Sequence, residues 1–269
     1  MPIITSRDNA RLKLARRVRD GRVRDLIFVE GLRLAEEALK SKIGIDEVFV
    51  SDRFERGERT ATVLDEIQSR GHAANVVAEQ HFQSIADTAN PQGIVLLGRR
   101  PDTGQINFAA RFADRRPTFP LVLLLHRVNN PSNLGAILRT AEAVGIAGVI
   151  LTRNSADVFS PKSLRASMGA AFRLNLWTNA AFDEALSWAR DAGLVTTAAD
   201  VNAKKNYLET DWQRPRLLVF GSEAHGLTDD ERDLIDELLV IPMAPEVESL
   251  NLAVACGVIL FEAKRQTQN

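Results

Sequence analysis

The sequence predicts an α/β protein of two domains. Across its 269 residues, short apolar runs typical of strands alternate with stretches of helical periodicity. The stretch 99–120 interrupts this alternation, because it is basic, contains three prolines and lacks a regular period. We therefore expect a first domain at 1–98, a connector at 99–120 and a second domain at 121–269.

The first domain is expected to begin with a helix. Ser6 is a candidate N-cap, and Leu12, Ala15 and Val18 follow it at helical spacing. Apolar runs then predict strands at 26–31, 46–51, 73–78 and 94–98. Stretches of mixed polarity between them predict helices at 32–40, 58–70 and 79–87. This order makes a small α/β unit.

The second domain repeats the alternation with more strongly apolar strands. These are expected at 121–126, 148–152, 174–177, 194–199, 216–220 and 238–242. Helices are expected at 133–144, 161–168, 181–191, 228–236 and 249–266. Because the strands are apolar on both faces, we expect a mostly parallel sheet covered by helices on both sides.

Composition restricts the class of protein. The chain carries 34 Lys and Arg against 35 Asp and Glu, and 45% of its residues are hydrophobic, which is typical of a soluble globular protein. A single cysteine, Cys256, excludes a disulfide framework. The four histidines are scattered, the N-terminus lacks an apolar signal segment, and the apolar run 250–261 is too short to span a bilayer. We expect a cytoplasmic protein without a metal site or a membrane partner.

Charge is distributed unevenly along the chain, although the net charge is −1. Residues 1–33 hold nine Lys and Arg against four Asp and Glu, and residues 99–120 hold five against two. Such a basic helix is usually a solvated surface, but it is also what a phosphate-binding surface requires. The net charge therefore does not exclude RNA.

Familiar nucleotide and catalytic signatures are missing. The chain contains no G-x-G, so the dinucleotide-binding fingerprint is absent. GSEAHG (221–226) has the glycine spacing of a P-loop, but Leu227 and Thr228 stand where Lys and Ser or Thr are required. H-E-x-x-H, C-x-x-C and G-x-S-x-G are also absent. These absences argue against a small-molecule enzyme with another nucleotide cofactor, which stays an open alternative.

Three polar clusters remain at the ends of predicted strands, where parallel sheets bind their ligands. They are NNPSNLGAILRTAEAVG (129–145), FGSEAHG (220–226) and IPMAPEVESLNLAVA (241–255). Taken singly, each has a structural explanation. Arg139 can pair with Glu142 on one helix. Glu223 can stabilise a helix N-terminus, and Ser249 can cap the last helix. Together the three clusters indicate one site.

The combination NxGxxxR, GSExxG and IPM followed by SLNLAVA resembles the SpoU (TrmH-like) family of RNA 2′-O-ribose methyltransferases, in the SPOUT superfamily. Further similar segments are SRDNARLKLARRVRD (6–20), FVEGLRLAEEAL (28–39), PQGI (91–94) and LRASMGAAFRL (164–174). The resemblance covers nearly the whole chain in order. His126 and Asn130 depart from it, because many relatives carry Asp there.

The resemblance implies the fold, the cofactor and the assembly. The first domain would be a small α/β domain similar to the ribosomal L30e/L7Ae fold. The second would be an α/β knot, a deep trefoil knot, that binds S-adenosyl-L-methionine, in a homodimer. The implied function is S-adenosylmethionine-dependent 2′-O-methylation of a ribose in structured RNA, with rRNA favoured over tRNA. A non-catalytic RNA-binding protein that retains the methyl-donor pocket is the alternative.

The resemblance also assigns roles to residues. Catalytic roles, at the ribose and phosphate or in the proton path, are implied for Arg139, Asn133, Glu223, Ser249 and Asn251. Contacts with the methyl donor are implied for Gly221, Ile241 and Leu250. Because arginine is normally protonated, we expect Arg139 to position and stabilise rather than to act as a base. RNA contacts are expected from Arg7, Arg11, Lys13, Arg16, Arg17 and Arg165, with the basic connector.

Overall fold

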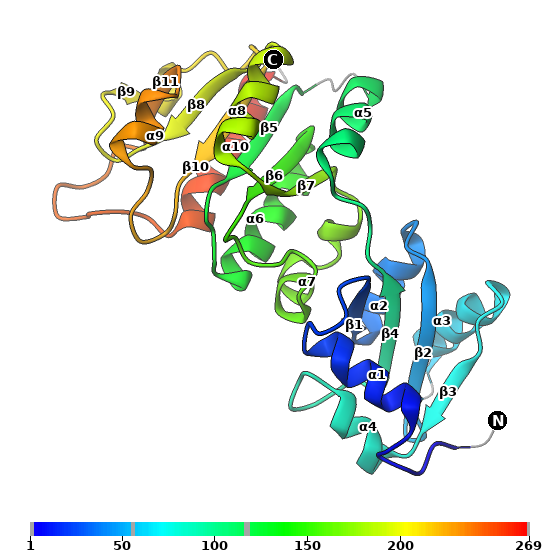
Figure 1. Cartoon of the computed structure of the whole chain (residues 1–269). Coiled ribbons are helices and arrows are strands. Elements are labelled where there is room, and N and C mark those ends of the chain that lie inside the picture. The colour runs from blue at the N-terminus through cyan, green and yellow to red at the C-terminus, as the bar shows by residue number, and fades with distance from the viewer. Residues whose placement is uncertain (1–2, 55–56, 116–118, 268–269) are drawn as a thin grey trace. The chain divides into compact units, whose positions relative to one another are not determined.

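The computed structural model describes residues 3–54, 57–115 and 119–267. The chain divides into two compact units (Figure 1). Unit 1 comprises Met1–Pro101 and Asp157–Arg173, and unit 2 comprises Asp102–Ala156 and Leu174–Asn269. Unit 1 is therefore discontinuous, because the chain returns to it from the middle of unit 2. This return was not expected from the sequence.

Unit 1 is built on a four-stranded sheet in the order β1-β4-β2-β3. The strands are β1 (Leu26–Glu30), β2 (Ile45–Ser51), β3 (Ala74–Val77) and β4 (Ile94–Arg99). The helices are α1 (Ala10–Arg19), α2 (Leu32–Lys40), α3 (Glu58–Ser69), α4 (Glu79–Ile85) and α7 (Pro161–Ser167), followed by the 3-10 helix η1 (Ala170–Phe172). β4 runs antiparallel to both β1 and β2, and β2 is parallel to β3. The expected mixture of helices and strands is confirmed.

Helix α1 begins later than predicted. Asn9 is its N-cap, because the Asn9 side chain accepts a hydrogen bond from the Arg11 backbone nitrogen. Ser6 instead closes a turn before the helix, and its hydroxyl accepts from the Asp8 nitrogen. The predicted buried face is correct: Leu12, Ala15 and Val18 lie in the core of unit 1.

Unit 2 is built on a seven-stranded parallel sheet in the order β7-β6-β5-β10-β8-β11-β9. The strands are β5 (Leu121–Leu125), β6 (Gly148–Thr152), β7 (Leu176–Ala180), β8 (Val195–Ala199), β9 (Lys205–Asn206), β10 (Arg216–Phe220) and β11 (Glu237–Val240). The helices are α5 (Gln105–Arg115), α6 (Pro131–Val144), α8 (Phe182–Asp191), α9 (Asp229–Asp233) and α10 (Leu252–Thr267), with the 3-10 helix η2 (Tyr207–Glu209). The predicted parallel sheet is confirmed, and β9 was not predicted.

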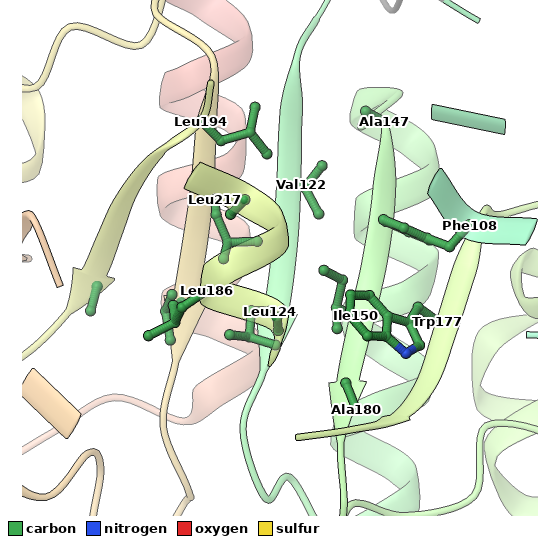
Figure 2. Packing of buried hydrophobic residues seen from close by; sticks show 14 of the residues in the cluster. Phe108, Val122, Leu124, Ala147, Ile150, Trp177, Ala180, Leu186, Leu194 and Leu217 are labelled. Carbon is green, nitrogen blue, oxygen red and sulfur yellow. The ribbon is translucent and has the colours of Figure 1, made fainter. Parts of the chain in front are cut away.

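Helices cover both faces of this sheet. Helices α6 and α10 pack against each other behind it, and α8 lies in front of it (Figure 1). On the α8 side, Leu186 meets strand residues such as Val122, Leu124 and Leu217 in one buried cluster (Figure 2). β5 and β10 are buried along their whole length, so the sheet centre fixes the position of the loops that follow these strands.

The segment 99–120 contains a regular helix that its sequence did not predict. β4 extends to Arg99, and α5 occupies Gln105–Arg115. Phe108 on α5 is fully buried in the unit 2 core beside Trp177 (Figure 2). The side chain of Asn175 donates to the Phe108 carbonyl at 3.1 Å. Much of the expected connector is therefore a core helix of unit 2.

Candidate active site

A pocket of about 610 Å³ lies in unit 2 at the carboxyl ends of β8, β10 and β11. This is where parallel sheets bind their ligands. Its volume is in the range of small-molecule sites, about 300–1,000 Å³. Seven predicted site residues line it: Asn133, Gly221, Glu223, Ile241, Ser249, Leu250 and Asn251.

The loop after β10 forms one wall of the pocket. The backbones of Ser222 and Gly226 exchange two hydrogen bonds, of 3.1 and 2.9 Å, which fold the loop back on itself. Gly221 is required by this fold, since a Cβ there would lie 2.3 Å from the carbonyl carbon of Gly226. Leu227 is buried in the core and anchors the end of the loop. The loop therefore presents Glu223 from a compact turn.

A chain of amide hydrogen bonds joins the three clusters. Asn251 is the N-cap of α10, because its Oδ1 accepts from the nitrogens of Ala253 and Val254 at 2.9 and 3.4 Å. Its Nδ2 donates to Oδ1 of Asn133 at 3.3 Å. Nδ2 of Asn133 in turn donates to Oε1 of Glu223. The prediction that Ser249 caps this helix is wrong, and Ser249 lies exposed at the pocket.

Arg139 is the one predicted catalytic residue that does not line the pocket. It is exposed on α6, six residues after Asn133. Because each helical residue turns by about 100°, Arg139 lies about 120° around the helix from Asn133. Within one chain, the structure brings together Asn133, Glu223, Ser249 and Asn251 but leaves Arg139 outside.

The sequence patterns did not point to an acid at the end of β8 whose side chain is only 7% exposed. Asp200 lines the pocket, and its carboxylate accepts from the Asn202 nitrogen at 2.7 Å and from Nη1 of Arg232 at 3.3 Å. Nη1 of Arg232 also donates to the Leu227 carbonyl at 2.8 Å, so it joins the two loops. An acid directly after an apolar strand, in TTAAD, is the signal that could have found it.

The two departures from the family pattern have structural roles. His126 is buried, with Nε2 3.0 Å from Oε1 of Glu231 and Nδ1 3.1 Å from the Thr152 hydroxyl. Burial lowers the pKa of His126 below its usual value, against the opposing charge of Glu231. Asn130 is the N-cap of α6 and accepts from the Ser132 nitrogen at 2.9 Å. Asn130 thereby fixes the helix start that carries Asn133.

The predicted RNA-binding residues of the N-terminal segment are partly engaged within unit 1. Nη1 of Arg16 donates to the Ser84 hydroxyl at 3.1 Å, and this bond ties α1 to α4. Nη2 of Arg16 donates to the Arg7 carbonyl at 2.8 Å. Arg11 donates to Asn75 and lies 3.6 Å from Glu47. Lys13 pairs with Asp8 at 3.0 Å. Arg7 and Arg17 are exposed. Arg165 lies elsewhere in unit 1, on α7, paired with Asp87 at 2.7 Å.

The described residues contain no group of three or more His, Cys, Asp or Glu side chains placed to hold a metal ion. Within the same ranges, no helix is both long and apolar enough to cross a membrane. Cys256 is buried in α10, and burial raises the pKa of its thiol.

Comparison with known proteins gives matches over both units. The model of the SpoU rRNA Methylase family matches residues 120–261, and a model described as RNA 2′-O ribose methyltransferase substrate binding matches residues 28–103. An uncharacterised tRNA/rRNA methyltransferase from Synechocystis sp. is 32% identical over 98% of this chain and 93% of its own length.

Two further matches bear on chemistry. A 23S rRNA (uridine(2479)-2′-O)-methyltransferase from Streptomyces viridochromogenes is 38% identical over 54% of this chain and 53% of its own. The crystal structure of an AdoMet-bound rRNA methyltransferase from Sinorhizobium meliloti superposes with a TM-score of 0.83. It is 29% identical, and the match covers 98% of this chain and 97% of that one.

Proposed function

Because the chain belongs to the SpoU rRNA methylase family, we propose that it transfers the methyl group of S-adenosylmethionine to a ribose 2′-hydroxyl in ribosomal RNA. The observation that carries this proposal is the hydrogen-bonded chain Asn251–Asn133–Glu223 inside the unit 2 pocket. The 2′-O position is supported by the Streptomyces relative and by the description of the substrate-binding model. The preference for rRNA over tRNA is supported by the Streptomyces relative and by the description of the family model.

The pocket fits the methyl donor in size and in chemistry. Its apolar wall includes Ile241, Leu250 and Ala255, which suits an adenosine ring system. Asp200 offers a carboxylate at the pocket to hydroxyl or amino donors. We propose that these residues and the backbone at Gly221 hold S-adenosylmethionine, which supplies an electrophilic methyl group on a sulfonium when bound.

The remaining residues act on the RNA hydroxyl. A ribose hydroxyl is a poor nucleophile unless its proton is removed or shared. Asn133 occupies one oxygen of Glu223, which fixes the direction of the carboxylate. The other oxygen is then oriented to accept a hydrogen bond from the substrate, and the exposed Ser249 can hold the neighbouring ribose or phosphate. Positioning of this kind lowers the entropic part of the barrier.

We further propose that the protein acts as a homodimer and that Arg139 serves the pocket of the other copy. Arg139 is exposed and lies outside the pocket of its own chain. On α10, which packs against the same helix α6, Val254 and Phe261 are 53% and 56% exposed. Exposed apolar residues on a helix that packs against the helix carrying Arg139 suit a subunit interface. The arginine would stabilise the phosphate and the developing negative charge on the ribose oxygen.

The test is to incubate the protein with methyl-labelled S-adenosylmethionine and total RNA, and then to hydrolyse the RNA in alkali. A methylated 2′-oxygen cannot attack the adjacent phosphate, so the label should survive in alkali-resistant dinucleotides from 23S or 16S rRNA. Label in mononucleotides would indicate base methylation and would contradict the proposal. Binding of the donor without transfer to any RNA would favour the non-catalytic alternative instead.

A further inference from the structure

A second pocket, of about 320 Å³, lies within unit 1. Three segments that are far apart in the sequence form it: the end of β1 with the start of α2, the loop before β4, and the end of α7. It is close to the lower limit of small-molecule sites, about 300 Å³. Such a pocket admits one planar ring system rather than a nucleic-acid helix.

The pocket walls are held by hydrogen bonds. Oε1 of Gln92 accepts from the Leu32 nitrogen at 2.9 Å, which fixes the loop before β4 against the first turn of α2. Gly31 makes this approach possible, because its φ is +101° and a Cβ there would lie 3.0 Å from Oε1 of Gln92. The site is therefore largely formed before any ligand binds.

The acid of the pocket has hydrogen-bond partners within the protein, whereas one buried nitrogen of Arg165 has none within the described part of the chain. Glu30 is buried, and its carboxylate accepts from the Asp87 nitrogen at 2.9 Å and from the Thr88 hydroxyl at 2.5 Å. Arg165 pairs through Nη2 with Asp87, while Nη1 is buried, 3.9 Å from Oε2 of Glu30. Among the described residues, Nη1 has no hydrogen-bond partner. A buried donor without a partner costs free energy, so a ligand that accepts from it gains affinity.

We propose that this pocket binds one unstacked nucleotide of the RNA substrate. The base would lie against Leu34 and Met168, with its polar edge toward Asn90, and the backbone phosphate would meet Arg165 and Arg33. Proteins read RNA mainly through bases that leave the stack and pack on apolar or guanidinium surfaces. Glu30 is already hydrogen-bonded and Asp87 pairs with Nη2 of Arg165, so the donors that face the pocket for a phosphate are Nη1 of Arg165 and the exposed Arg33. The proposal rests on the proposed function only in taking RNA as the substrate.

The test compares variants for binding of 23S rRNA transcribed in vitro, by filter binding at fixed salt. Arg33→Met and Asn90→Ala change exposed residues, and Arg165→Met removes the guanidinium while keeping the side-chain stem. Arg70→Met is the matched control, because it removes the same charge from an arginine of unit 1 that pairs with Glu66 of α3, and neither residue lines the pocket. Melting temperatures and S-adenosylmethionine affinity are measured for every variant.

Each pocket variant is expected to raise the Kd for RNA about 5- to 20-fold, in the range of one lost base or phosphate contact. The control should change it less than about 2-fold, and affinity for the donor should stay constant throughout. A Kd unchanged in Asn90→Ala, or arginine variants that match the control, would overturn the proposal. Because these readouts are of binding, they are independent of methyl transfer. A wild-type protein that transfers no methyl group would count against the proposed function alone.

Discussion

The side-chain amide of Asn251 donates to Oδ1 of Asn133 at 3.3 Å, which links the N-terminus of α10 to the first turn of α6. Each amide in this link is used twice, because Asn251 also caps α10 and Asn133 also donates to Glu223. The direction of the Glu223 carboxylate is therefore set by helix capping. A change in Asn133 should disturb the geometry of catalysis more than the stability of the fold.

Asn133→Ala is expected to lower kcat for methyl transfer by about 100-fold, because misplacement of a reacting group by an ångström has an effect of this order. The melting temperature should change little, since Asn133 is only half-buried. Ser132→Ala, at the exposed neighbouring position, is the control and should retain wild-type kcat. Equal kcat values for the two variants would remove Asn133 from the catalytic geometry.

Arg139→Ala is expected to abolish methyl transfer while leaving S-adenosylmethionine affinity unchanged, because Arg139 does not line the donor pocket. Calorimetric titration with the donor checks the second part. Arg111→Ala, which removes an exposed arginine from α5, serves as the control for loss of charge.

Mixing the Arg139→Ala variant with the impaired Asn133→Ala variant tests whether Arg139 acts across subunits. In a mixed dimer of Arg139→Ala with Asn133→Ala, one pocket keeps its own Asn133 and receives Arg139 of the partner subunit. Random reassembly should restore about a quarter of wild-type activity, because half of the dimers are mixed and each has one complete site. No restoration on mixing would show that Arg139 acts within its own chain or not at all.

Because His126 is buried, we expect the folded protein to lose stability in mild acid. Burial lowers the pKa of this imidazole below 6.5, so the unfolded chain takes up a proton at a higher pH than the folded protein does. The stabilisation is complete above 6.5 and declines as pH falls from that value toward the lower pKa of the folded protein. The pKa of Glu231 lies below its usual value of 4.5. Burial alone would raise it, but the Thr228 backbone nitrogen, His126 and Arg127 lower it by more. The stabilisation that Glu231 contributes to the fold is therefore lost only as the pH falls below 4.5.

The measurement is the melting temperature at about pH 7.5 and about pH 5.5. The wild-type protein should lose melting temperature on acidification, and His126→Asn should lose less. His72→Asn, a variant of a half-buried histidine in unit 1, should behave like the wild type. An identical acid-induced loss in His126→Asn would assign the effect to other groups.

Phe108→Ala tests whether the helix in the expected connector belongs to the core. Removing a fully buried phenylalanine should lower the free energy of unfolding by about 3–5 kcal/mol. Ile106→Ala, on the same helix at a position that is 86% exposed, should change it by less than about 0.5 kcal/mol. Denaturant unfolding followed by the fluorescence of Trp177 and Trp188, which lie against Phe108, reports both values. Equal losses in the two variants would contradict the burial of α5.

The elements that could be predicted are those whose local pattern of apolar and polar residues determines their structure. β5 and β10 are continuous apolar runs, and the clusters after the strands pointed to the residues that now line one pocket. Helix α5 was not predicted, because its buried face depends on a few aromatic contacts with distant segments, chiefly those of Phe108 with Trp177 and Trp188. The trefoil knot and the residue roles stay predictions from the family resemblance, and the domain limits stay a prediction from the sequence pattern.

Other features depend on tertiary contacts that no local pattern contains. Both Ser249 and Asn251 are good capping residues, and only the observed start of α10 at Leu252 selects Asn251. Likewise, Arg16 was predicted to bind RNA because it lies in a basic helix. Its hydrogen bond to Ser84 could not be predicted, because Ser84 lies on a helix that is distant in the sequence. The placement of Asp200 beside Arg232 has the same origin.

The discontinuous unit 1 has a consequence for how the protein is made. Helix α7, which packs on β1, is synthesised about 130 residues after that strand, when β5 and β6 have already been translated. The N-terminal unit therefore cannot complete its structure on the ribosome until residues through Arg173 have emerged. A fragment that ends at residue 98 would leave the α7 contact surface of β1 uncovered, and its aggregation during translation is the failure to expect.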